Sequence, residues 1–110
     1  MSTIPFEQFQ EADIRIGTIK EAEAVPESNK LLKLSVDFGE KAPRQVISGI
    51  GKSVLPKGII GLQAAFIINL EPREIMGLES QAMILAIDTP SKGLTFASPS
   101  IPIEPGSKLH

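Results

Sequence analysis

The chain has 110 residues, a net charge of −2 and a sequence pI near 5.4, so it has room for one modest core and one domain over residues 1–110. It has no cysteine, which excludes disulfide and thiolate chemistry, and no apolar run approaches the ~20 residues of a membrane-spanning helix. The first residues show no secretory signal, so we expect a cytoplasmic protein without membrane association.

The first predicted element is a short helix over F-E-Q-F-Q-E-A, directly after Pro5. Ser2 or Thr3 is expected to cap this helix, with the proline in its first turn. Phe6 and Phe9 are three positions apart and therefore share one helix face. We expect their rings to cover the end of a sheet.

Five strands are predicted after the helix. The first begins at Ile14, and its alternation slips at Gly17, where a β-bulge would bend the strand. The others are expected at residues 31–38, 44–50, 62–70 and 80–87, with a helical turn or loop at residues 51–61 closing one barrel end. The predicted core residues are Ile14, Ile16, Leu32, Leu34, Val36, Phe66, Ile68, Ile84 and Leu85.

This order of elements predicts an all-β fold, a five-stranded oligonucleotide/oligosaccharide-binding (OB) barrel. An SH3-like barrel would have shorter strands and no interruption between the third and fourth strands. Residues 88–110 contain four prolines, so they cannot form a long helix and should be an irregular tail that covers the barrel or pairs as short strands. Four apolar tail residues have little core of their own and favour a homodimer: Leu94, Phe96, Ile101 and Ile103.

Catalytic chemistry finds little support in the sequence. The only histidine is the terminal His110, and neither metal-ligand spacing nor a nucleophile elbow is present. The G-K-S at residues 51–53 lacks the first glycine of a phosphate loop, because Val46 stands there. We therefore expect no enzymatic activity, no metal site and no cofactor.

The composition limits how the chain could bind nucleic acid. Because the net charge is negative, affinity for phosphates must come from a local basic patch. The chain has no Trp or Tyr, and of its phenylalanines only Phe96 lacks an obvious buried role, so stacking on splayed bases is not expected. Recognition of shape and backbone is favoured instead.

The loop at residues 70–83 is the most informative part of the sequence. Pro72 restricts the backbone just before Arg73, so the guanidinium is presented from a loop of limited shape. Gly77 can adopt the turn geometry that the return of the chain requires.

Four segments carry a resemblance to a known family: D-I-R-I-G-T-I (13–19), P-E-S-N-K-L-L-K-L (26–34), R-Q-V-I-S-G-I (44–50) and N-L-E-P-R-E-I-M-G-L-E-S-Q-A-M (69–83). In order and spacing they resemble the tRNA-binding domain family, found at the C-terminus of bacterial methionyl-tRNA synthetase, in cytokine-like synthetase cofactors and as free-standing dimeric tRNA-binding proteins. The resemblance implies an OB barrel, a homodimer and structure-specific binding to the folded corner of tRNA, with an aminoacyl-tRNA synthetase as a candidate partner.

The resemblance also implies the site residues. The RNA-binding candidates are Asn29, Lys30 and Lys33 in the first loop and second strand, Arg44 at the start of the third strand, and Arg73, Ser80 and Met83. Lys and Arg would contact phosphates, and the serine a phosphate or ribose oxygen. The chain has Glu74 where family members commonly carry a basic residue, and Ala82 where they commonly carry glycine. Three glutamates near the arginine predict weak affinity.

Two alternatives remain open at this stage. A second branch of the family resembles a secretion-related chaperone that binds peptides in a groove of its dimer. It ranks lower because that branch tends to lose the S-G-I that is intact at residues 48–50. The third reading is an assembly module that holds a synthetase together through the apolar, proline-rich tail.

Overall fold

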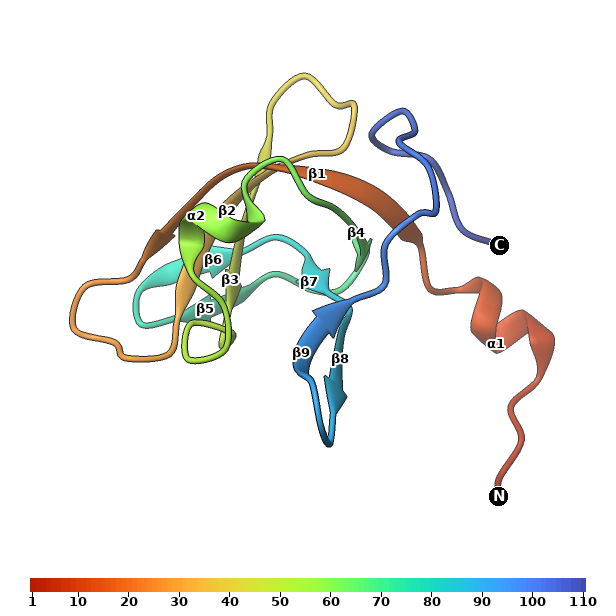
Figure 1. Cartoon of the computed structure of the whole chain (residues 1–110). Coiled ribbons are helices and arrows are strands. Elements are labelled where there is room, and N and C mark those ends of the chain that lie inside the picture. The colour runs from red at the N-terminus through yellow and green to blue at the C-terminus, as the bar shows by residue number, and fades with distance from the viewer.

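The computed structural model describes residues 1–110 and is built around a five-stranded antiparallel sheet with strand order β3-β2-β1-β4-β7 (Figure 1). These strands are β1 (Ile14–Ala24), β2 (Leu32–Asp37), β3 (Arg44–Ser48), β4 (Gln63–Ile67) and β7 (Met83–Ile84). The edges at β3 and β7 are joined through Gln81, whose amide donates to the Gln45 carbonyl and whose side-chain oxygen accepts from the Gln45 amide, both at 2.8 Å. The sheet is therefore a nearly closed barrel, and the predicted OB barrel is confirmed.

The bend of β1 lets one strand serve both halves of the barrel. It pairs with β4 over residues 14–18 and with β2 over residues 18–24. The predicted bulge at Gly17 is wrong: the register shifts at Lys20, while the glycine pairs regularly with Ala64. A Cβ at Gly17 would lie 2.5 Å from Cγ1 of Val36 and 2.6 Å from the Phe38 ring, so the glycine allows close packing inside the barrel.

The main core fills this barrel. Its twelve buried members are Ile19, Leu32, Leu34, Val36, Phe38, Val46, Ile50, Ile59, Ala64, Phe66, Ala82 and Ile84. Five predicted core residues are therefore confirmed in it, Leu32, Leu34, Val36, Phe66 and Ile84. Ile16 is buried outside this cluster, and Ile14, Ile68 and Leu85 are half-buried. The predicted helical turn is α2 (Pro56–Ile59), which inserts Ile59 into the main core.

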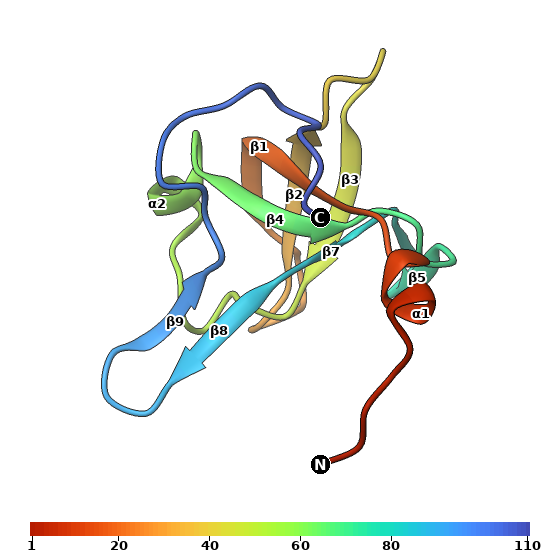
Figure 2. The ribbon, with the colours of Figure 1, turned by 90° about the vertical axis from the view of Figure 1, so that its right-hand side faces the viewer.

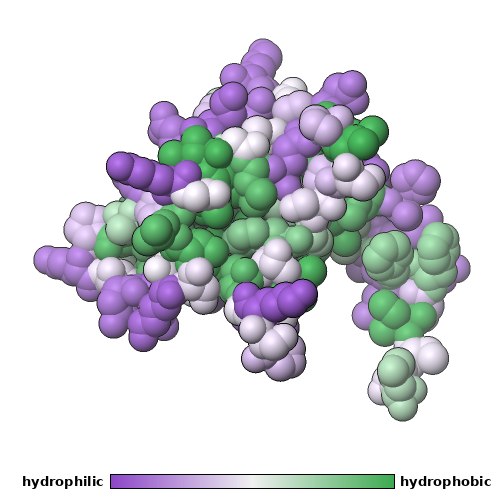
Figure 3. Space-filling model, viewed as in Figure 1, coloured by the Kyte–Doolittle hydropathy of each residue, from purple (hydrophilic) through white to green (hydrophobic).

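The N-terminal helix does not cover the sheet. Helix α1 (Phe6–Gln10) starts after Pro5, with no side-chain cap from Ser2 or Thr3. In Figures 1 and 2 the arm that carries it projects from the barrel, and the space-filling view in Figure 3 shows apolar side chains along it. Phe6 and Phe9 are 66% and 43% exposed, with ring centroids 6.4 Å apart. The helical spacing correctly put the rings on one face, but that face borders a pocket with C-terminal residues 108–110 and does not cover the end of the sheet.

The expected strand at residues 80–87 is divided, and two hairpins flank the barrel. One consists of β5 (Arg73–Ile75) and β6 (Leu78–Ser80), and the other of β8 (Ala86–Thr89) and β9 (Gly93–Phe96). Between β6 and β7, the Ser80 hydroxyl donates to the Ala82 carbonyl and accepts from the Ile47 amide. These bonds lie where the chain leaves β6, before β7 begins at Met83.

The C-terminal tail shows both predicted forms, because its first part pairs as short strands in the β8–β9 hairpin and its last part lies on the barrel. Gly106 donates to the Ile16 carbonyl at 2.7 Å, and the Ile16 amide donates to the Ser107 carbonyl at 2.9 Å, so the tail follows the part of β1 that β2 leaves unpaired. Leu94 and Phe96 pack against the main core, which corrects the expectation that they lack cover of their own. No helix in the structure has the length and hydropathy needed to cross a membrane.

Candidate nucleic-acid interface

A second, smaller hydrophobic core joins the two loops that an OB barrel uses for binding. The β5–β6 hairpin turns at Met76 and Gly77, whose φ values of 52° and 79° are those of a two-residue type I′ turn. One face of the hairpin packs across the outer side of β3 and against both ends of the first loop. The residues of this second core are Val25, Leu31 and Ile47, with Ile75 and Leu78 packed against them.

The first loop, residues 25–31, is held internally and by its neighbour. The Ser28 hydroxyl accepts from the amides of Lys30 and Leu31, at 3.3 and 3.1 Å. The Gly51 amide donates to the Lys30 carbonyl at 2.7 Å, and a Cβ at Gly51 would lie 2.8 Å from that oxygen. Asn29 and Lys30 are therefore exposed on an ordered loop.

One cation near this loop was missed from the sequence. Lys52 is exposed and directly follows Gly51, the residue that contacts the first loop. Its position directly after the S-G-I motif could have indicated a basic residue near the first loop. The sequence pattern G-K-S instead suggested only a comparison with a phosphate loop. A glycine before this lysine is compatible with a phosphate loop and equally with a close approach to the backbone of the first loop.

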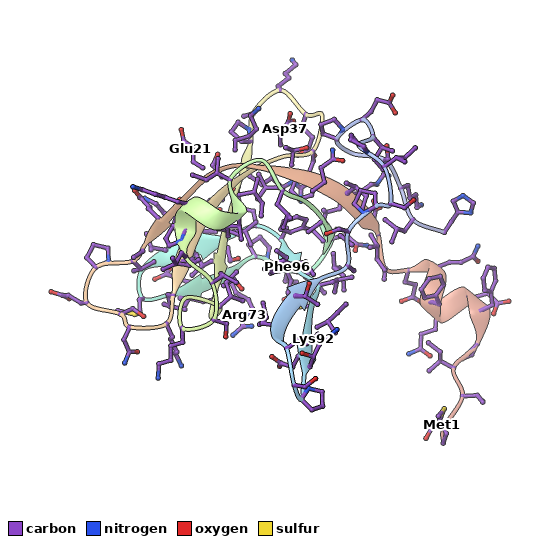
Figure 4. The ribbon with its side chains drawn as sticks, viewed as in Figure 1. Met1, Glu21, Asp37, Arg73, Lys92 and Phe96 are labelled. Atoms are coloured by element: carbon purple, nitrogen blue, oxygen red, sulfur yellow. The ribbon has the colours of Figure 1, made fainter.

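Arg73 lies at the start of β5 and is exposed (Figure 4). It lines a small, largely apolar cleft with Ser80 and Met83, so the structure brings these three candidates together. Ser80 is buried, and its hydroxyl is engaged by Ile47 and Ala82. Met83 is 44% exposed and available to a ligand.

Lys33 and Arg44 lie on a different surface. Both line a polar groove of about 340 Å³ along β1, β2 and β3, together with Glu21 and Glu23, but Arg44 stands opposite the buried Val36 and so lies on the inward side of β3. The Lys33 ammonium is 2.8 Å from the Glu23 carboxylate. Glu21 makes no ion pair and points away from β1 (Figure 4).

The donors of Arg44 are engaged within the protein. Its Nε and Nη2 both donate to the Glu40 carboxylate at 2.9 Å. Its Nη1 donates to the Ile68 carbonyl at 2.7 Å and to the Gln81 carbonyl at 3.1 Å. The hydrogen bonds with Glu40 raise the pKa of Arg44 and lower the pKa of Glu40. Arg44 therefore ties β3 to the chain beyond β4 and to the chain before β7.

Acidic groups surround the hairpin. Glu74 and Glu79 face one another in the β5–β6 register, and both are exposed. Like charges directly opposite each other destabilise a strand pair. Among the cations near the two loops, Lys30, Lys52 and Arg73 make no salt bridge in the structure. No group of three or more His, Cys, Asp or Glu side chains is arranged to hold a metal ion.

Known proteins share both the sequence and the fold. The chain is similar to Methionine--tRNA ligase from Methanococcoides burtonii, 42% identical over 107 residues, which cover 97% of this chain and 16% of the relative. It spans only 12% to 16% of the length of such curated relatives.

Among solved structures, a MetRS related protein from Pyrococcus horikoshii has a TM-score of 0.91 and 27% identity over 100% of both chains. The chaperone CsaA from Bacillus anthracis has a TM-score of 0.87 and 28% identity, covering 99% of this chain and 100% of that one. The family model described as a putative tRNA binding domain matches residues 14–108, and the chain belongs to this tRNA-binding domain family.

Proposed function

We propose that this chain is a non-catalytic module that binds folded tRNA through the loop end of its barrel. The observation that carries the proposal is the family match over residues 14–108 on an OB barrel whose first loop and β5–β6 hairpin are packed together. Lys30, Lys52 and Arg73 lie at this end without ion-pair partners, so they can contact phosphates without first breaking a salt bridge. Asn29 and Met83 are exposed beside them and complete the proposed contact surface.

The remaining candidates have less direct roles in the proposal. Lys33 would contact a phosphate only in competition with Glu23. Ser80 would act by holding the hairpin base against β3, and Arg44 by closing the barrel.

The proposed recognition is of shape and backbone rather than of splayed bases. Phe38 and Phe66 are buried in the main core, Phe96 packs against it, and the chain has no Trp or Tyr. The outer face of β1 to β3 therefore lacks the aromatic platform on which single-stranded bases stack. Binding should favour a folded RNA over an unstructured one of equal length.

Filter binding tests this proposal. We expect folded tRNA to bind more tightly than an unstructured RNA of the same length. Its affinity should fall steeply as salt is raised from about 50 to about 200 mM, because binding to phosphates releases counterions. Equal binding of both RNAs, or binding that salt does not weaken, would contradict the proposal.

The proposed working form is a homodimer in the cytoplasm that assists a methionyl-tRNA synthetase. Support comes from exposed apolar residues on the N-terminal arm and the tail, among them Ile4, Phe6 and Ile101, the last 66% exposed. Sedimentation at micromolar concentration tests the dimer, and co-purification tests the synthetase. A monomer, or a lack of synthetase in the eluate, would remove that part of the proposal.

A peptide-binding chaperone is the second candidate function. The similarity to chaperone CsaA over almost the whole chain favours it. The affinity for a peptide bound through apolar contacts would change little with salt, whereas the affinity for phosphates would fall as salt is raised. Titration of the same preparation with an apolar peptide and with tRNA at two salt concentrations separates the two candidates.

A further inference from the structure

We propose that the second core is the positioning element of the RNA interface, and that it sets the spacing between Lys30 in the first loop and Arg73 in β5. This inference rests on the proposed function and adds to it the residues that hold the interface in shape. Leu78 is the residue through which it can be tested.

The second core is separate from the main core. Ile47 faces outward from β3, and its neighbour Val46 faces inward into the main core. Val25 and Leu31 stand at the two ends of the first loop, joined by the hydrogen bond from the Val25 amide to the Leu31 carbonyl at 3.1 Å. The hairpin therefore covers both ends of the loop that presents Lys30.

Few other contacts hold the hairpin in place. Its two strands pair only with each other. Gln45 donates from Nε2 to the Glu79 carbonyl at 2.9 Å, and the Ile47 amide donates to the Ser80 hydroxyl at 3.0 Å. Both bonds are made by the end of β6 and none by the turn, so the side chains of Ile75 and Leu78 hold the distal half. A segment with so few tethers opens at a lower free energy than the barrel does.

The spacing matters because the proposed cations come from different segments. A binding surface that is already ordered avoids the cost of ordering it when the ligand arrives. Arg73 pairs with Ser80 at the base of the hairpin, so it is displaced with β5 only when loss of the second core also loosens that base, while Lys30 stays with the first loop. One phosphate contact is then lost or has to be re-formed at a cost.

The test truncates Leu78 without touching a charged group. We expect Leu78→Ala to weaken tRNA binding by about tenfold, the size of one lost hydrogen bond to a charged group. The slope of log affinity against log salt should become shallower by roughly 0.7 to 0.9. Hydrogen exchange should become faster at the hairpin amides and stay unchanged in β1. Leu78→Met, which nearly conserves the volume, should restore all three.

Leu94→Ala is the matched control. It is the same truncation of a half-buried leucine in the other hairpin, but Leu94 packs against the main core. It should lower the stability of the barrel and leave tRNA affinity and salt slope as in the parent. This separates loss of positioning from general loss of stability.

A double-mutant cycle gives the decisive result. If Leu78 acts by positioning Arg73, Leu78→Ala should cost little more affinity in an Arg73→Ala background. An equal loss in both backgrounds, or faster exchange in the hairpin with unchanged affinity, would overturn the inference. Failure of the proposed function appears elsewhere, as no salt-sensitive tRNA binding by the parent or no effect of Arg73→Ala, and the inference falls with it.

Discussion

The strands of the sheet and the loop end of the barrel both carry cations, but the two regions differ in what those cations contact. On the strands, Lys33 is paired with Glu23 and Arg44 with Glu40. At the loop end, Lys30 and Arg73 have no such partner. A cation that already has a carboxylate partner gains less from a phosphate, because the first pair must be given up. The difference teaches that residues of the same charge and the same family motif can differ in whether they are available to a phosphate.

The largest expected effect is a loss of stability, and it tests whether Arg44 has a structural role. Arg44→Met removes four hydrogen bonds, leaves Glu40 without its partner and should lower the free energy of unfolding by about 2 to 3 kcal/mol in urea denaturation. The tRNA affinity of the folded fraction should change little. Unchanged stability together with a clear loss of affinity would instead make Arg44 an RNA contact.

The next effect addresses the loop end directly. Arg73→Ala should weaken tRNA binding by about 1.5 to 2 kcal/mol with almost no change in stability, since the side chain is exposed and unpaired. Lys33→Ala should cost less affinity because Glu23 already neutralises Lys33. Filter binding of both variants ranks the two surfaces, and a larger loss for Lys33→Ala would reverse the comparison.

A gain is expected on the hairpin. Glu74→Lys replaces two facing carboxylates, Glu74 and Glu79, by an opposite-charge pair and adds a cation next to Arg73 in the sequence, on the other face of the hairpin. Affinity should rise by about 0.5 to 1 kcal/mol. Glu104→Lys makes the same charge change in the tail and serves as the control. An equal gain in affinity for this variant would mean that the net charge of the protein, and not the position of the lysine, causes the gain.

A smaller gain sharpens the comparison on the sheet face. Glu23→Gln frees the Lys33 ammonium and should tighten tRNA binding by about 0.2 to 1 kcal/mol, the range of an exposed ion pair. The gain should disappear when Lys33→Ala is also present. If the gain survives in that double variant, Glu23 acts on the RNA without Lys33 and the proposed competition is wrong.

The smallest effect is on pH dependence. Hydrogen bonds from Arg15 and Arg44 lower the pKa values of Asp13 and Glu40 below their ordinary values. A carboxyl group with a lowered folded-state pKa stabilises the protein above its unfolded-state pKa, and this stabilisation is lost as the pH falls through the folded-state pKa. Stability should therefore decrease below about pH 4, where ordinary carboxyl groups titrate. When stability is measured against pH, the Glu40→Gln variant should show a smaller decrease in acid than the parent. An identical curve would mean that the Glu40–Arg44 ion pair does not contribute to this decrease.

Much of the barrel could be predicted because its signals are local. The alternation of Leu32, Leu34 and Val36 directly reports a strand with one buried face. The role of Gly17 could not be predicted, because a glycine in a strand indicates either a bulge or a close approach, and only the packing of Val36 distinguishes the two. Residues 80–87 are divided among β6, β7 and β8, and the alternation of the sequence does not reveal these divisions.

The candidate site was less predictable for the same reason. The second core gathers residues from the first loop, β3 and the hairpin, so no local pattern announces it. A sequence motif also does not distinguish an arginine that closes a barrel from one that is free to bind phosphate, since the distinction depends on the carbonyls of Ile68 and Gln81. The sequence therefore identifies the charged residues at these positions, but it does not show which of them are free to bind a phosphate.

The pairing of the tail with β1 has a consequence for handling the protein. An uncovered strand edge is a template for other chains, and residues 106–109 occupy the edge that β2 leaves open. Shortening the chain before Gly106 would uncover the edge at Ile14 and Ile16 and favour aggregation. A purification tag or fused partner is better joined at the projecting N-terminal arm, where it leaves this edge undisturbed.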